Sequence, residues 1–205
     1  LEFICMRKIS ILLLFIFLFL SSKAYTQWDG FSSINTRFAG DDSWKEWVIK
    51  LDNNYYTLQT IFSGDDAWKQ WKIDLLNSIG QISTVFSGNN AWQKWQFDIS
   101  SVSGNIYTVF SGNDAWKDWY IYSGGVTLRA TTVYSGDDAW REWNISGPKG
   151  YIRVYTLFSG NNGWMDWQIE DNMLNEKPQI RMAAIFPCIV SAFLVKSFGI
   201  NDNKN

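Results

Sequence analysis

Acidic residues occur in adjacent pairs along the chain, and paired carboxylates can bind calcium or perform acid–base catalysis. The pairs are Asp41-Asp42, Asp65-Asp66 and Asp137-Asp138. In three further copies of the same motif the pair is Asn89-Asn90, Asn113-Asp114 or Asn161-Asn162. Asparagine neither titrates nor adds negative charge. The motif therefore predicts no catalytic residue, no metal site and no cofactor, with weak metal binding by the Asp-Asp copies as the alternative.

Aspartate and asparagine share a short side chain that bonds to nearby backbone N–H groups in turns. We therefore interpret Ser-Gly-Asx-Asx-Ala-Trp as a structural turn, either a strand connection or one helical turn capped by its Ser and Asx side chains. Few other side chains could act as catalytic groups or metal ligands, because the chain has no histidine and its two cysteines are Cys5 and Cys188. A metal cluster of His and Cys is excluded, and we do not predict an enzyme.

Two tryptophans follow each turn in the pattern Trp-x-x-Trp, which contains twelve of the thirteen tryptophans. The second is followed two residues later by Ile or Phe and is predicted to face the core. The first would point the opposite way on an extended backbone. We expect these first indoles to pack in the core or the turn, and they are the one recurring element that could form a ligand platform. The candidate ligand-binding residues are Trp44, Trp68, Trp92, Trp116, Trp140, Trp164, Asp65, Asp66, Asp137 and Asp138.

These motifs recur every 24 residues, with the aromatic residue that opens each copy at 38, 62, 86, 110, 134 and 158. Such a period indicates stacked or cyclically arranged units. Each unit has two predicted strands; in the first, an apolar residue, a threonine and the aromatic residue share one face. The six units occupy residues 31–54, 55–78, 79–102, 103–126, 127–150 and 151–174.

The chain ends in a polar linker and an apolar segment, within residues 175–205. The apolar run of 182–195 is shorter than a membrane span, and a helix that is apolar all round is a buried one. We therefore predict an all-β fold: a closed or nearly closed antiparallel β-barrel of about twelve strands, filled or capped by a C-terminal helix. The alternatives are a β-solenoid capped by this segment and an open or sandwiched sheet.

The first 24 residues resemble a secretory leader. Met6 is the predicted natural start, followed by Arg7 and Lys8, an apolar stretch and a small-residue cleavage site near Ala24. Its removal would leave the β domain from residue 25 to residue 174 and change the formal net charge from −2 to −4, because three basic residues and one acidic residue leave with it. A mildly acidic chain without a basic cluster is not a nucleic-acid-binding protein.

These features predict an exported, non-enzymatic repeat protein, secreted or placed in the periplasm or at the cell surface. Its function would be binding or surface interaction, with the repeated Ser-Gly-Asx-Asx-Ala-Trp loops contacting a glycan or another cell-surface ligand at several equivalent positions. The alternative is a structural, envelope-associated protein held at a membrane by residues 180–198. The sequence indicates neither the identity of the ligand nor the oligomeric state.

Overall fold

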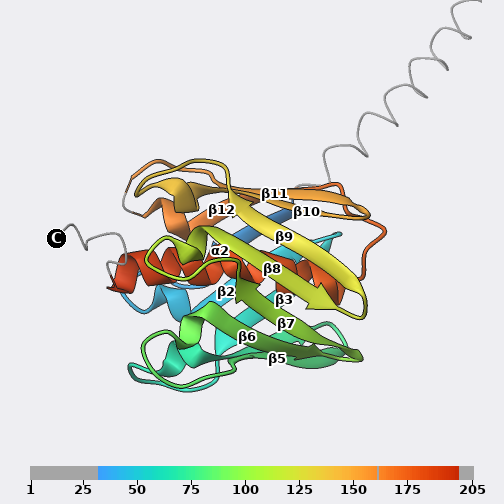
Figure 1. Ribbon diagram of the computed structural model, residues 1–205, viewed down its shortest axis with the longest axis horizontal. Coiled ribbons are helices and arrows are strands. Elements are labelled where there is room, and N and C mark those ends of the chain that lie inside the picture. The colour runs from blue at the N-terminus through green and yellow to red at the C-terminus, as the bar shows by residue number, and fades with distance from the viewer. Residues whose placement is uncertain (1–31, 161, 199–205) are drawn as a thin grey trace, which may run out of the picture. The chain divides into compact units, whose positions relative to one another are not determined.

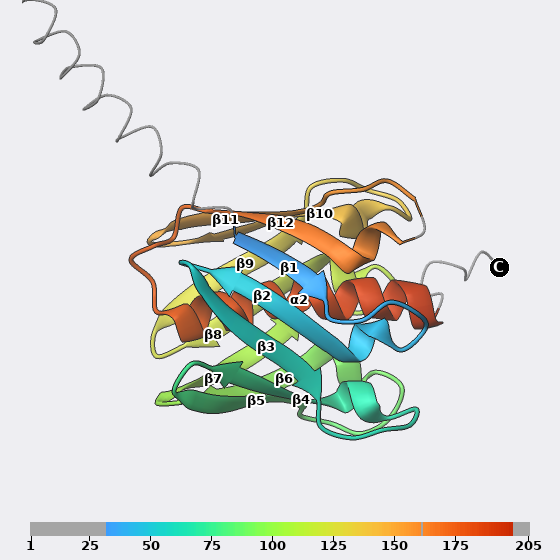
Figure 2. The same cartoon turned by 180° about the vertical axis from the view of Figure 1, so that it is seen from behind.

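The computed structural model describes residues 32–160 and 162–198. These residues form a closed barrel of twelve antiparallel strands around one helix (Figures 1 and 2). Each strand pairs with its neighbours along the chain, and the pairing of the first strand with the last closes the barrel, with Ile34 opposite Trp167. The predicted barrel is confirmed, whereas the solenoid and the open sheet are not observed. The predicted leader and its cleavage near Ala24 lie outside the described residues.

Each 24-residue unit contributes a strand, one 3-10 turn and a second strand. The strands are β1 (Ser32–Thr36), β2 (Glu46–Leu51), β3 (Asn54–Thr60), β4 (Gln70–Leu75), β5 (Ser78–Thr84), β6 (Lys94–Ile99), β7 (Val102–Thr108), β8 (Asp118–Ser123), β9 (Val126–Thr132), β10 (Glu142–Gly147), β11 (Gly150–Thr156) and β12 (Asp166–Asp171). The turns are η1 (Ser43–Lys45), η2 (Ala67–Lys69), η3 (Ala91–Gln93), η4 (Ala115–Lys117), η5 (Ala139–Arg141) and η6 (Gly163–Met165). Helix α2 spans Pro178–Phe198.

The alternation of side chains along each strand decides which face is inside. In β4, Trp71, Ile73 and Leu75 are buried, and the residues between them are partly exposed. Successive side chains of a strand point to opposite faces of the sheet, so this pattern gives the barrel an apolar interior and a polar outer wall.

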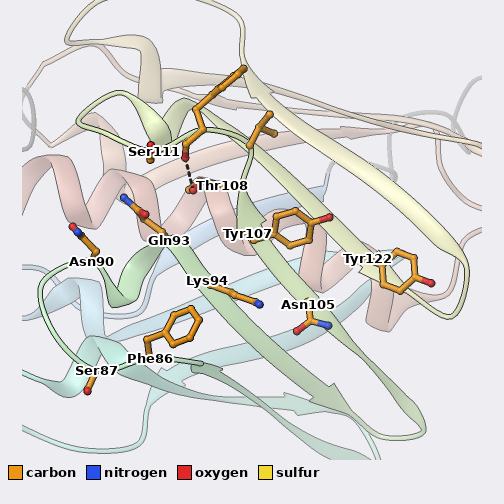
Figure 3. A pocket seen from close by; sticks show the side chains of 12 residues that line it. Phe86, Ser87, Asn90, Gln93, Lys94, Asn105, Tyr107, Thr108, Ser111 and Tyr122 are labelled. Carbon is orange, nitrogen blue, oxygen red and sulfur yellow. Dashed lines mark hydrogen bonds between the residues drawn. The ribbon is translucent and has the colours of Figure 1, made fainter.

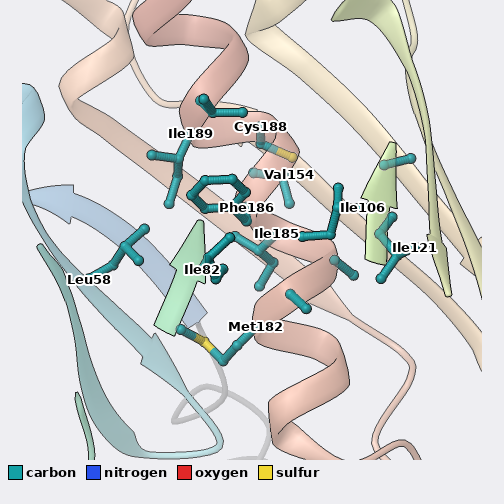
Figure 4. Packing of buried hydrophobic residues seen from close by; sticks show 14 of the residues in the cluster. Leu58, Ile82, Ile106, Ile121, Val154, Met182, Ile185, Phe186, Cys188 and Ile189 are labelled. Atoms are coloured by element: carbon teal, nitrogen blue, oxygen red, sulfur yellow. The ribbon is translucent and has the colours of Figure 1, made fainter. Parts of the chain in front are cut away.

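Helix α2 lies inside the barrel. A barrel of about eight strands is filled by its own side chains, and a wider one leaves room that must be occupied. The helix supplies that filling, with Ile185, Phe186 and Ile189 fully buried among inward-facing strand residues (Figure 4). The stretch Pro178–Val195 is long and apolar enough to cross a membrane, but 83% of it is buried here. Its position matches the predicted filling helix.

One buried ion cluster ties the first turn of α2 to the end of the barrel that carries the two-residue hairpin turns. Arg181, which is 1% exposed, pairs with Asp171 at the end of β12 and with Asp52 in the turn between β2 and β3. Burial alone would lower the pKa of Arg181, but its hydrogen bonds to Asp52 and Asp171 leave it raised. The pairing compensates for the removal of the charge from water.

The aromatic residue that opens each motif does not share the inner face, contrary to the prediction. Each odd-numbered strand ends at its threonine, and the next residue still donates its N–H across the sheet, as Ile61 does to the carbonyl of Gln70 at 3.0 Å. The chain then turns outward into the Ser-Gly loop. The six aromatic side chains are therefore 57–62% exposed: Phe38, Phe62, Phe86, Phe110, Tyr134 and Phe158.

Candidate functional site

The Trp-x-x-Trp motif is built on a 3-10 turn rather than on extended chain. Gly64 turns the backbone with a φ of 91°, and the corresponding glycines have φ between 90° and 110°, a region that favours glycine. The N–H of Ala67 then donates to the Gly64 carbonyl at 3.1 Å. With three residues per turn, residues three apart lie on the same side. Trp68 and Trp71 therefore both face inward.

The spacing also satisfies the indole N–H that burial would otherwise leave unpaired. Nε1 of Trp71 donates to the carbonyl oxygen of Trp68 at 2.6 Å, and the same bond forms in every unit, at 2.5–2.8 Å. A buried donor without a partner costs about 1–3 kcal/mol. The three-residue separation thus allows the second indole to be fully buried in all six units.

The indoles of neighbouring units form a continuous ring, which we call the indole belt. The first Trp of each unit packs at an angle against the second Trp of the next, with ring centroids 5.9–6.4 Å apart, and Trp164 packs on Trp47 to close the ring. Helix α2 fills its centre, where Phe186 contacts Trp71 and Trp95. The indole belt is therefore part of the core.

The first indoles pack in or against the core, as expected, and they do not point the opposite way because the backbone there forms a 3-10 turn and is not extended. Trp68, Trp92, Trp116, Trp140 and Trp164 are at most 9% exposed. Trp44 is partly buried and stacks on Phe193 of α2 at 4.2 Å. A ligand platform needs an exposed ring face, so the first indoles lose the structural basis for that role at the five buried positions.

The candidate aspartates Asp65, Asp66, Asp137 and Asp138 lie in exposed loops. The second Asx residue of each motif was one of the candidates to cap a helical turn. Its side chain makes no capping hydrogen bond, so this interpretation is wrong. Asp66 instead pairs with Lys69 at 2.6 Å and Asp138 with Arg141 at 2.9 Å. No group of three or more acidic, His or Cys residues in the described part of the chain could hold a metal ion.

These ion pairs explain the alternation between Asp and Asn in the motif. Where the second Asx is Asp, a Lys or Arg follows three residues later and also lies over the ring of the first Trp, as Lys69 does at 5.6 Å from Trp68. Where it is Asn90 or Asn162, the later residue is uncharged, Gln93 or Met165. The two positions change together, and the fold accepts either combination.

The candidate binding site is a groove on the outer wall of the barrel. It lies between units three and four, over β6, β7 and β8 (Figure 3). It encloses about 960 Å³, and we call it the unit 3/4 groove. An adjoining groove of about 620 Å³ shares Asn105 and Tyr122 with it and continues over the wall towards β5. The lining of the unit 3/4 groove is Phe86, Ser87, Asn90, Gln93, Lys94, Asn105, Tyr107, Thr108, Val109, Phe110, Ser111 and Tyr122.

This lining combines aromatic rings with amide side chains. Phe86 and Phe110 are among the most exposed aromatic residues described, and Tyr107 and Tyr122 are 36% and 46% exposed. The amide of Asn105 lies on β7, whereas Gln93 belongs to η3 and Asn90 to the loop before it. An amide offers both a donor and an acceptor. None of the twelve lining residues is acidic, so the unit 3/4 groove suits a polar ligand with an apolar face.

The loop of unit four is fixed against the strand that precedes it. The Thr108 hydroxyl donates to the backbone carbonyl of Phe110 at 2.8 Å (Figure 3). The Tyr107 ring lies 5.9 Å from that of Tyr120. On the opposite side, the Lys94 ammonium lies 5.6 Å from the centroid of the Phe86 ring. These contacts restrain the Tyr107 and Phe86 rings and the backbone at Phe110.

In the next two units, ion pairs cross the part of the wall that corresponds to Lys94 and Asn105. Asp118 and Arg129 form a two-bonded pair at 2.6 and 2.9 Å, and Glu142 bonds to Arg153 at 2.8 Å. The hydrogen bonds to these carboxylates raise the pKa of both arginines. Between units three and four a lysine faces an amide instead, and the wall carries no such pair there.

The repeated motif does not indicate the unit 3/4 groove, because Lys94, Asn105 and Tyr122 have no counterpart of the same type in the other units. The signal was nevertheless present: with the six units superimposed at their spacing of 24, Lys94 stands where the others have Glu46, Gln70, Asp118, Glu142 and Asp166. A basic residue at a position that is acidic in four of the other five units is a departure that the fold does not require.

Comparison of the chain with protein-family models, with curated proteins and with solved structures gave no match.

Proposed function

We propose that the protein is an exported, non-enzymatic binding protein that holds a glycan chain in the unit 3/4 groove. The observation that carries this proposal is the lining itself, in which four exposed aromatic residues and three amide side chains line one groove. Asn105, Tyr107 and Tyr122 lie on strands, and binding residues carried by strands keep their geometry better than residues on loops.

The lining matches the two kinds of surface that a sugar ring presents. Its hydroxyl groups donate and accept hydrogen bonds, as do the amides of Asn90, Gln93 and Asn105. Its C–H faces are apolar and can pack on rings such as Tyr107 and Tyr122. The adjoining groove continues the polar wall with Gln81 and other side chains, which favours a chain of several sugars over a monosaccharide.

An extended peptide fits this wall less well. Peptides that bind to sheets commonly add a strand to a free edge, and in the described residues every strand of the barrel is paired on both sides. A ligand on the outer wall must therefore be bound through side chains alone, which is how a glycan would bind.

The distribution of acids supports binding rather than glycan hydrolysis. Most glycosidases place two carboxyl groups about 5–10 Å apart around the scissile bond. The unit 3/4 groove has no acid in its lining, and the adjoining groove has one, Asp98. The alternative of a membrane anchor formed by residues 180–198 would require α2 to leave the barrel.

The test compares groove tyrosines with matched tyrosines elsewhere on the wall. We expect Tyr107→Ala together with Tyr122→Ala to weaken binding of neutral and acidic oligosaccharides of four to six sugars at least tenfold by calorimetry. Tyr55→Ala together with Tyr151→Ala removes two exposed rings outside the groove and should leave affinity unchanged. The proposal is wrong if the unaltered protein binds no oligosaccharide of a broad panel, or if both double variants bind equally well.

A further inference from the structure

We propose that Lys94 makes the unit 3/4 groove selective for a glycan that carries a carboxylate, as uronic acids do. This inference rests on the proposed function, since it names the class of sugar bound at the same site. It is carried by three observations: the charge at position 94, the loss of charge around it, and the absence of an acidic partner for its ammonium group.

The first observation is an inversion of charge at one position of the repeat. Four of the five equivalent residues are acidic, and each of those is occupied by a partner. Asp166 accepts a hydrogen bond from Asn35 at 2.8 Å, and the other three form ion pairs: Glu46 with Arg37, Asp118 with Arg129 and Glu142 with Arg153. At this position in unit three the wall presents an ammonium group instead of a paired carboxylate.

The second observation is that the surroundings of Lys94 have lost their acids. The loop from Ser87 to Gln93 contains no charged residue, whereas the loop of unit two contains Asp65 and Asp66. The one acid that lines either groove, Asp98, belongs to the adjoining groove and not to the unit 3/4 groove. In a chain with a net charge of −2, this end of the groove is a local positive site, and such a site favours an anionic group.

The third observation concerns the contacts of Lys94 itself. Among the described residues its ammonium forms no ion pair, and it lies beside the Phe86 ring, 5.6 Å from the centroid. Figure 3 shows it between Phe86 and Asn105, whereas Gln93 and Asn90 lie further along the groove. An arriving carboxylate would therefore displace no competing acid and would find the amide of Asn105 on the same side as the ammonium.

The composition of the site favours a carboxylate over a sulfate or a phosphate. Binding sites for sulfate or phosphate use bidentate arginine side chains, several basic residues or a set of backbone N–H groups. The unit 3/4 groove has one lysine and no arginine in its lining. A single ammonium in a lining whose other polar groups are neutral matches a singly charged, planar group.

The experiment uses two ligands that share one sugar chain and differ at the carboxyl groups: an oligogalacturonate of four to six sugars, which is charged, and its fully methyl-esterified form, which is neutral. By calorimetry at low salt, the protein should bind the acid about tenfold more tightly than the ester, as expected for one hydrogen bond to a charged group. Lys94→Gln should remove the preference, Lys94→Glu should reverse it, and 0.5 M NaCl should reduce it. Lys72→Gln, which removes a wall lysine outside the groove, is the matched control and should retain the preference.

The outcomes separate the two proposals. Equal binding of acid and ester by the unaltered protein, unchanged by Lys94→Gln, overturns the role of Lys94 and leaves glycan binding intact. Failure of both ligands and of the broad panel to bind overturns the glycan function as well. Tighter binding of a sulfated oligosaccharide than of the oligogalacturonate overturns the choice of carboxylate. Binding of the ester by Lys94→Gln with unaltered affinity shows that the variant groove is intact and supports the assignment.

Discussion

The inside and the outside of the barrel differ in how closely they follow the 24-residue repeat. In the indole belt all twelve positions are tryptophan, and the same hydrogen bond and ring contact recur around the whole circumference. On the outer face of the strands the equivalent positions vary in charge, size and polarity, and at Lys94 the charge is inverted. The buried positions of the belt therefore repeat strictly, whereas the strand positions that face outward vary from unit to unit.

Physical constraints explain the contrast. Each indole in the belt contacts the next unit and the N–H of each second indole is bonded to the backbone, so a different side chain would leave a cavity or an unpaired polar group. A side chain on the outer wall faces water, where substitutions usually change the free energy of unfolding by less than about 0.5 kcal/mol. The wall can therefore change in one sector without disturbing the fold.

The largest effect is expected from removing the filling of the barrel. Deletion of residues 176–205 takes α2 away and exposes the inner face of twelve strands to water. We expect loss of cooperative unfolding, measured by calorimetry together with binding of a hydrophobic dye. The matched variant Ser191→Ala removes only the 3.2 Å hydrogen bond from α2 to the Trp116 carbonyl and should cost about 1 kcal/mol. A truncated chain that melts like the full one would show that the interior does not depend on α2.

A second prediction compares one ring inside with one ring outside. Trp119 is fully buried, contacts Trp92 and bonds to the Trp116 carbonyl at 2.6 Å. Trp119→Ala should lower the free energy of unfolding by about 3–5 kcal/mol. Tyr107→Ala, in the unit 3/4 groove, should lower it by less than about 1 kcal/mol while weakening glycan binding. Denaturant titrations of both variants measure the difference, and equal losses of stability would remove the distinction between belt and wall.

The fold could be predicted from the sequence because its determinants recur six times. A period of 24 without insertions, alternation in each strand and one apolar segment of the right length left few ways to bury the apolar residues. The orientation of the first Trp could not be derived in the same way. It depends on whether the backbone after Gly64 is extended or a 3-10 turn, and the alternation rule applies only to extended chain.

The candidate site could be predicted only in part. The sequence predicts a polar, aromatic binding surface on the recurring indoles and loops, whereas the groove that carries our proposal is lined by the exposed Phe86, Tyr107 and Phe110. The grouping of these rings with Asn90 and Asn105 depends on the register between neighbouring strands, which brings two loops and three strands to one place. A single sequence contains the charge inversion at Lys94 but not the distances that turn it into a site.

A third prediction uses Cys188, which is fully buried in α2 and whose pKa is raised well above its usual value by burial. The folded protein keeps this thiol neutral, whereas the unfolded chain ionises it above about pH 8.5. The neutral Cys188 thiol therefore contributes fully to the free energy of unfolding below that pH. As the pH rises further, the free energy of unfolding falls by about 1.4 kcal/mol per pH unit. Denaturant titrations from pH 7 to 10 should show a steeper loss for the unaltered protein than for Cys188→Ala. Parallel slopes would show that the interior around α2 admits water.

The smallest effect is expected in the loops, where Asp66 and Lys69 can be replaced by the asparagine and glutamine that unit three carries in their place. The carboxylate of Asp66 is largely exposed, so the ion pair is screened by water. A double-mutant cycle of Asp66→Asn and Lys69→Gln isolates the pair from the contact of Lys69 with Trp68, because that contact is lost in both variants that lack the lysine. The coupling energy should be about 0.5 kcal/mol or less, and it should fall further in 0.5 M NaCl. A coupling above about 1.5 kcal/mol would mean that the loop charges are required by the fold. The neutral loop of unit three would then reduce the stability of the fold. Its lack of charge could no longer be explained by a surface that tolerates substitution and so is free to bind a ligand.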